Sequence, residues 1–156
     1  MAVWKQPHIS KTYEAIGGVG DDRIEVKGNT AKVYSSSRGK YYEVKWDPAT
    51  QTISSNDNSS YWVGELGYPS IMLLIKLGVI DCDESLFEIL RGFAWKDINQ
   101  KYKNKFDKTV KEVRDVLEQR GVDMADFDTK LNHVVDQVNT LKLNKPTTKK
   151  RPPAGY

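Results

Sequence analysis

The chain has 156 residues, of which 38% are apolar and 29% are charged. This length can enclose one hydrophobic core without disulfides or a metal, and this composition is typical of a globular domain rather than a disordered or membrane-spanning chain. The longest apolar run, from Ile71 to Ile75, is far shorter than the roughly 20 residues that a bilayer span requires, so no membrane partner is expected.

The charge is unevenly distributed along the chain. The net charge is +3 at pH 7. Residues 145–156 hold four basic side chains and no acid, whereas the preceding residues hold the other 20 basic side chains and all 21 acidic ones. The folded body is therefore nearly neutral, and a short basic tail of this kind can contact phosphate groups.

The cellular compartment follows from cysteine usage and from the N-terminus. Cys82 is the single cysteine, which excludes an internal disulfide framework and suits a reducing environment. The N-terminal residues lack the apolar core of a secretion signal. Both observations predict a cytoplasmic protein.

The first predicted element is a short helix over residues 8–20. Ser10 is its expected N-cap, and Tyr13 and Ile16 fall on one side of it. The stretch 17–20 contains three glycines, which permit positive φ and disfavour helix, so we expect the helix to end there.

A β meander is predicted next, because short runs of alternating apolar and polar residues are separated by turn residues. The strands are expected at residues 23–27, 30–36, 40–46 and 51–54. In the third, Tyr42, Val44 and Trp46 alternate with polar residues, a pattern typical of an antiparallel strand with one buried face and one exposed face.

The chain becomes helical after the fourth strand. Pro69 suits the first turn of a helix, where its missing N–H is no loss. The run Ile71–Ile75 is apolar on every side, which predicts a helix buried in the middle of the molecule. A further helix is expected over residues 84–90, with Asp81 or Asp83 as its cap.

The last third predicts a long αα-hairpin, since apolar residues recur there at intervals of three and four. Its first helix is expected to run from Trp95 to Leu117 and its second from Met124 to Leu141, with Gly121 and Asp123 in the connection. Each apolar stripe can pack on its partner, on the sheet or on a second subunit.

Together these elements predict an α+β fold. An antiparallel meander of three to four strands packs on a buried central helix, and a C-terminal αα-hairpin follows. Residues 1–144 are expected to form a single domain, mainly β over residues 8–66 and helical over residues 67–144. Residues 145–156 are rich in proline and are expected to form a flexible basic tail.

The order of elements over residues 22–78 resembles the SWIM zinc-finger family. In that family a β hairpin and the motif C-x-C-P-D precede C-x-H and an apolar helix. The stretch Ile53–Asp57 stands in the place of C-x-C-P-D, and Tyr68–Ile71 stands in the place of C-x-H-I. The four ligand positions are then occupied by Ile53, Ser55, Tyr68 and Ser70.

None of these four side chains suits Zn²⁺, which prefers thiolate or imidazole ligands. The resemblance therefore implies a degenerate zinc finger in which apolar packing replaces the metal. SWIM domains bind DNA or proteins, so the resemblance implies binding rather than catalysis. The alternative is an ordinary α+β domain in which this order of elements is coincidental.

No metal, cofactor or catalytic site is expected elsewhere in the chain. Cys82, His8 and His133 lie far apart in the sequence, and His133 near Asp136 is best explained as a surface pair. An enzyme is the third hypothesis, and it requires a fold that brings Cys82 to a histidine and a carboxylate.

The first functional hypothesis is a non-catalytic module that binds DNA or RNA. Aromatic residues of the sheet and its loop can stack bases, while nearby basic residues contact phosphates. The expected binding residues are Arg38, Lys40, Tyr41, Lys45, Tyr61, Trp62, Lys149, Lys150 and Arg151.

The second hypothesis is a protein–protein adaptor or a homodimer that associates through the C-terminal hairpin. Two long amphipathic helices with near-heptad stripes are what such an interface uses. The expected interface residues are Phe106, Val113, Leu131 and Val138. Packing of the same stripes within the chain is the simpler alternative.

Overall fold

The four predicted strands form one antiparallel sheet in the computed structural model, which describes residues 2–154. Their order in the sheet is their order in the chain, as expected of a meander. The strands are β1 Ile24–Lys27, β2 Thr30–Tyr34, β3 Tyr41–Asp47 and β4 Thr52–Ser55. Alternation places Val33, Val44 and Ile53 on the buried face of this sheet.

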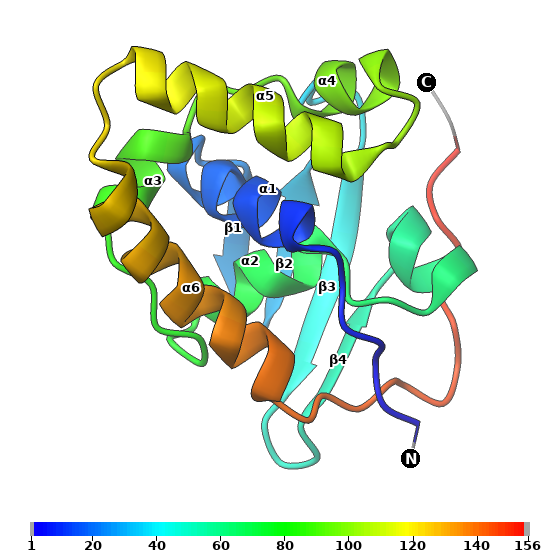
Figure 1. The fold of residues 1–156 in the computed structure, drawn as a ribbon. Helices are drawn as coiled ribbons and strands as arrows, with labels where there is room; N and C mark the ends of the chain where they lie inside the picture. The colour runs from blue at the N-terminus through cyan, green and yellow to red at the C-terminus, as the bar shows by residue number, and fades with distance from the viewer. Residues whose placement is uncertain (1, 155–156) are drawn as a thin grey trace.

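The buried face of the sheet carries a helical layer (Figure 1). The central helix α2, Tyr68–Lys76, lies directly on the sheet, and its residues Ile71–Leu74 are fully buried. The other helices are α1 Ile9–Gly20, α3 Ser85–Leu90, α4 Trp95–Lys101, α5 Phe106–Gln119 and α6 Met124–Thr140. The predicted α+β architecture is confirmed. Among the described residues, every helix is too short or too polar to span a bilayer.

Helix α1 does not end at its first glycine, contrary to the expectation from the sequence. It continues through Gly17 and Gly18 to Gly20. A Cβ built on Gly17 would lie 2.7 Å from the Leu90 carbonyl oxygen, so α1 contacts the α3 backbone closely. Packing therefore outweighs the low helix propensity of glycine here. The N-cap is His8, not Ser10, because His8 Nδ1 accepts a hydrogen bond from the Ser10 N–H at 3.0 Å.

The first helix of the predicted hairpin is broken in two. Helix α4 ends at Lys101 and α5 begins at Phe106. Between them Lys103 and Asn104 have φ values of 52° and 62°, which a continuous helix cannot contain. Apolar residues recur every three or four positions on both sides of this break. Periodicity alone therefore predicted one continuous helix.

Helices α5 and α6 pack on α1 rather than presenting their apolar stripes to a partner (Figure 1). Val113, Leu131 and Val138 are buried in the core, so the expected protein interface is wrong for these three residues. Phe106 is half-buried, and its ring lies 5.8 Å from that of His8. The simpler alternative, packing within the chain, accounts for the stripes.

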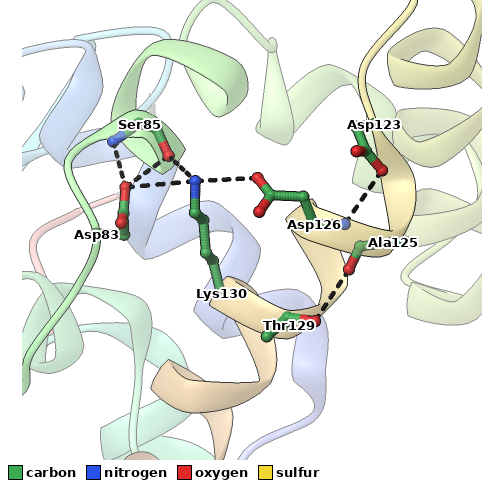
Figure 2. Close-up of polar contacts among 7 residues, drawn as sticks. All are labelled: Asp83, Ser85, Asp123, Ala125, Asp126, Thr129 and Lys130. Atoms are coloured by element: carbon green, nitrogen blue, oxygen red, sulfur yellow. Dashed lines mark hydrogen bonds and ion pairs between the residues drawn. The ribbon is translucent and has the colours of Figure 1, made fainter.

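Lys130 links the beginning of α3 to the first turns of α6 (Figure 2). Its ammonium lies 2.9 Å from Asp126 Oδ2 and 3.2 Å from Ser85 Oγ. Asp83 Oδ1 accepts hydrogen bonds from the backbone and side chain of Ser85, and Asp123 caps α6 by accepting from the Asp126 N–H. Asp83 and Asp123 thus act at the helix beginnings where the sequence places them.

Arg114 of α5 joins three helices through hydrogen bonds. Its guanidinium donates to Tyr13 Oη of α1 at 3.0 Å and to both carboxylate oxygens of Asp128 of α6 at 2.6 and 3.0 Å. These bonds hold the pKa of the Asp128 carboxyl below its ordinary value.

Replacement of Arg114 by methionine is expected to lower the free energy of unfolding by about 1 kcal/mol at pH 7, since solvent weakens a pair whose members are about one-third exposed. The pKa of Asp128 is depressed by folding. Its contribution is therefore present above the unfolded pKa of about 4 and is lost as pH falls through the folded value. Urea denaturation across this range should show a difference between wild type and variant that shrinks with acid.

The control for this prediction is Lys111→Met. Lys111 pairs with Asp115 on the exposed surface of α5, and such pairs contribute little to stability. A loss in the Arg114→Met variant that stays constant with pH would contradict the role given to Asp128.

Candidate nucleic-acid interface

One face of the sheet is not covered by the helical layer. The helices lie on the opposite side of β1–β4 (Figure 1), and the outward residues of β2 and β3 alternate with buried ones. Strand register places Lys32 beside Glu43, Tyr34 beside Tyr41 and Thr30 beside Lys45. We call these outward residues the open sheet face: Thr30, Lys32, Tyr34, Tyr41, Glu43 and Lys45.

Two tyrosines form an aromatic pair at one end of the open sheet face. The ring centroids of Tyr34 and Tyr41 are 6.0 Å apart, and the Lys32 ammonium lies 5.0 Å from the Tyr41 ring centroid. Tyr41 remains 43% exposed. An exposed ring beside an ammonium group is the combination that stacks bases and holds phosphates.

A second aromatic group projects from η1, a short π-helical turn over Ser59–Val63 that follows β4. Trp62 is 67% exposed, and its ring lies 4.6 Å from that of Tyr61 in a perpendicular arrangement. Asp57 supports this turn, because its carboxylate accepts hydrogen bonds from Ser55 Oγ and Ser60 Oγ, each at 2.6 Å. The aromatic pair therefore stands on a well-anchored turn.

The basic tail lies between η1 and the open sheet face. Lys149 Nζ donates to the Tyr61 carbonyl oxygen at 3.2 Å, and the Lys150 ammonium pairs with Glu43. The Arg151 carbonyl oxygen accepts a 3.5 Å hydrogen bond from Asn56 Nδ2. These contacts bring residues distant in sequence onto one surface.

The segment that leads into the tail is fastened to the end of β4. Leu143 is buried, and the Asn144 N–H donates to the Gln51 carbonyl oxygen at 2.8 Å. The backbone contact continues to Lys145, whose N–H donates to the Ala2 carbonyl oxygen at 2.8 Å, and the boundary at residue 144 stays a prediction. Flexibility of residues 145–156 stays a prediction, although the structure lays residues 149–151 against the body and does not describe residues 155–156.

Of the nine expected binding residues, two lie on the open sheet face, two on η1 and three on the tail, whereas Arg38 and Lys40 lie elsewhere. Arg38 donates to the Asp21 carbonyl oxygen at 3.1 Å, and the Lys40 ammonium lies 5.7 Å from the ring centroid of Tyr42, on the covered face. Both therefore face the helical side. The tail joins the other two parts through Lys149, which contacts Tyr61, and Lys150, which contacts Glu43 beside the outward residues Tyr41 and Lys45.

Lys32 and Tyr34 belong to the surface but were missed by the sequence reasoning. Ala31 and Val33 are buried, and strand alternation places their neighbours outward. The alternation of apolar and polar residues in the second strand could have revealed both residues. It had to be read together with the alternation in the third strand.

Cys82 is poorly suited to act as a nucleophile. Burial, and secondarily the carboxylates of Asp83 and Asp81, raise the pKa of its thiol to about 12, so little thiolate exists at neutral pH. His133 Nε2 lies 3.1 Å from Asp81 Oδ2, so its partner is Asp81 rather than the expected Asp136.

The positions equivalent to the SWIM ligands are used differently. Ile53 belongs to the core, and Ser55 donates to Asp57. Ser70 is fully buried, and its hydroxyl has no hydrogen-bond partner among residues 2–154. The resemblance to the SWIM family itself stays a prediction.

Comparison with known proteins places the chain in a family. No curated protein and no solved structure matches it. A family model described as "Uncharacterised conserved protein UCP014422" matches residues 4–144, which span the whole folded body from Trp4 to Asn144. The chain therefore belongs to the family of uncharacterised conserved protein UCP014422.

Proposed function

We propose that this protein is a non-catalytic module that binds single-stranded nucleic acid. The bases stack on Tyr41 and Trp62, and the phosphates contact the lysines around them. The observation that carries this proposal is that the basic tail contacts both η1, which exposes the Trp62 ring, and the open sheet face, which exposes the Tyr41 ring.

The charges support a modest electrostatic contribution. The body is nearly neutral, and Glu43 lies on the open sheet face beside Lys150. Most of the positive charge available to a phosphate backbone therefore belongs to the tail. Stacking, which does not depend on net charge, supplies the remaining affinity.

Measurement of binding by fluorescence anisotropy tests the proposal, with labelled single-stranded RNA and DNA of mixed sequence over a series of salt concentrations. Replacement of Lys149, Lys150 and Arg151 by glutamine is expected to reduce the slope of log affinity against log salt by about 2. This value follows from about 0.7 for each lost phosphate contact.

Trp62→Ala is expected to weaken binding by about 1–3 kcal/mol while leaving the salt slope unchanged, because it removes stacking and no charge. Val63→Ala is the matched control, since Val63 is the exposed apolar neighbour of Trp62. Absence of binding to both nucleic acids at low salt would overturn the proposal. An affinity that is unchanged when Trp62 and Tyr41 are replaced would refute the stacking contribution.

A further inference from the structure

A cavity of about 320 Å³ lies on the helical side of the sheet, away from the open sheet face. Its walls come from α1, α2, α4, the loop between β2 and β3, and the residues around η1. These segments are widely separated in the sequence. The ionisable side chains among its lining residues are Lys11, Glu14, Tyr42, Asp57, Tyr68 and Lys96.

Glu14 is the unusual member of this lining. Only 6% of the residue is exposed, and it borders the cavity. Its carboxylate forms no hydrogen bond or ion pair within residues 2–154, and its oxygens are not among the fully buried polar atoms without a partner, so they keep contact with solvent. Burial raises the pKa of this carboxyl, although Lys11 and Arg23 oppose the rise. A buried carboxylate without a partner lowers stability, so its presence beside a cavity points to a ligand.

The other buried acid of the cavity already has protein partners. The Asp57 carboxylate accepts hydrogen bonds from the hydroxyls of Ser55 and Ser60 and from the Ser60 N–H. Its role in holding η1 is therefore sufficient to explain its burial. Glu14 has no such explanation within the described chain.

Lys11 lies one helical turn before Glu14 and does not pair with it. Its ammonium instead lies 4.3 Å from the ring centroid of Phe106, and the residue is half-exposed. Residues three apart on a helix have Cβ atoms about 5–6 Å apart. The cavity thus offers an acid without a hydrogen-bond partner and a cation one helical turn away, both among its lining residues.

We propose that this cavity binds a free α-amino acid, whose ammonium group Glu14 receives and whose carboxylate contacts Lys11. The ammonium supplies the donors that the buried carboxylate lacks, as a charge-assisted hydrogen bond requires. Tyr42 and Tyr68, which also line the cavity, supply the surface for the side chain of the ligand.

Thermal unfolding in the presence of each of the 20 proteinogenic amino acids tests this inference, at about 10 mM of each, since a ligand that binds the folded state raises Tm by mass action. At least one amino acid is expected to raise Tm. Its decarboxylated amine and its deaminated acid should each bind at least about tenfold more weakly by calorimetry, because each lacks one charged end.

Glu14→Gln is expected to abolish the ligand-induced shift without lowering Tm in the absence of ligand. Lys11→Gln is expected to weaken binding of the amino acid and to leave binding of the decarboxylated amine unchanged. Because Lys11 is half-exposed, this variant is expected to fold normally. Glu25→Gln, an exposed change on β1, is the control.

No shift with any of the 20 amino acids would overturn the inference, as would unchanged affinity in both the Glu14 and Lys11 variants. A lower Tm of unliganded Glu14→Gln would indicate a structural role instead. The outcome is separable from that for nucleic acid, because Glu14→Gln is expected to bind oligonucleotides as the wild type does.

Discussion

Replacement of Gly20 by alanine is expected to lower the free energy of unfolding by about 3 kcal/mol, at the upper end of the usual range for overpacking. A Cβ at this position would lie under 3.0 Å from the Phe87 carbonyl oxygen, a separation that real Cβ atoms essentially never show. The obstacle is backbone, so α1 and α3 must separate to accommodate the methyl group. This cost outweighs the gain of up to about 1 kcal/mol from the better helix propensity of alanine.

Urea denaturation of the purified variant measures this effect. Gly18→Ala is the matched control, because its Cβ would meet the sulfur and methyl group of the Met72 side chain, which can rotate away. We expect the Gly18 variant to lose much less stability than the Gly20 variant. A Gly20 variant as stable as wild type would mean that the close approach of α1 and α3 is absent.

Trp95→Ala is expected to cost about 3–5 kcal/mol, the usual range for removing a fully buried tryptophan. Trp95 begins α4 and is fully buried, and its indole nitrogen would lie 2.9 Å from a Cβ on Gly17. The residue thus fastens α4, which forms one wall of the cavity, to α1, which carries Glu14.

Trp95→Phe is expected to cost less than half as much, measured in the same denaturation experiment. The Trp95 indole N–H is buried, and no atom of residues 2–154 accepts a hydrogen bond from it. Replacement by phenylalanine therefore reduces the volume of the ring but breaks no hydrogen bond. Trp62→Ala is the control for Trp95→Ala, because it removes the same side chain from a position that lies mostly in solvent. Equal losses at Trp95 and Trp62 would contradict this account of the core.

Much of the proposed nucleic-acid interface could be predicted from the sequence, because a strand alternates with a fixed period. The pattern at residues 40–46 places Tyr41 and Lys45 outward whatever packs on the other face. Lys40 was misplaced although the alternation of residues 40–46 already puts it on the same face as Tyr42. Arg38 was misplaced because it belongs to the turn before β3, where no period constrains the direction of a side chain. The direction of Arg38 depends on Asp21, which tertiary folding brings near.

The proposed amino-acid site could not be predicted in this way. Glu14 lies on a short helix between apolar residues, and its charge predicts exposure. Its burial results from β3, α2 and α4 closing around α1, and these segments are separated from it by tens of residues along the chain. No local sequence pattern indicates which distant segments surround Glu14.

The sequence by itself determined the strands, the buried helix α2 and the cap at Asp123, because these depend on alternation, apolar runs and local hydrogen bonds. It left Asp81 and Asp83 as alternatives at the beginning of α3, where Asp83 accepts from Ser85. Tertiary structure alone decided that α1 continues through its glycines and that the helix after Trp95 breaks at residues 102–105. It also decided that the hairpin stripes face α1 and that Glu14 is buried without a partner. The physical reason is that close backbone contact and burial depend on neighbours from distant segments, whereas propensity and periodicity describe one segment at a time.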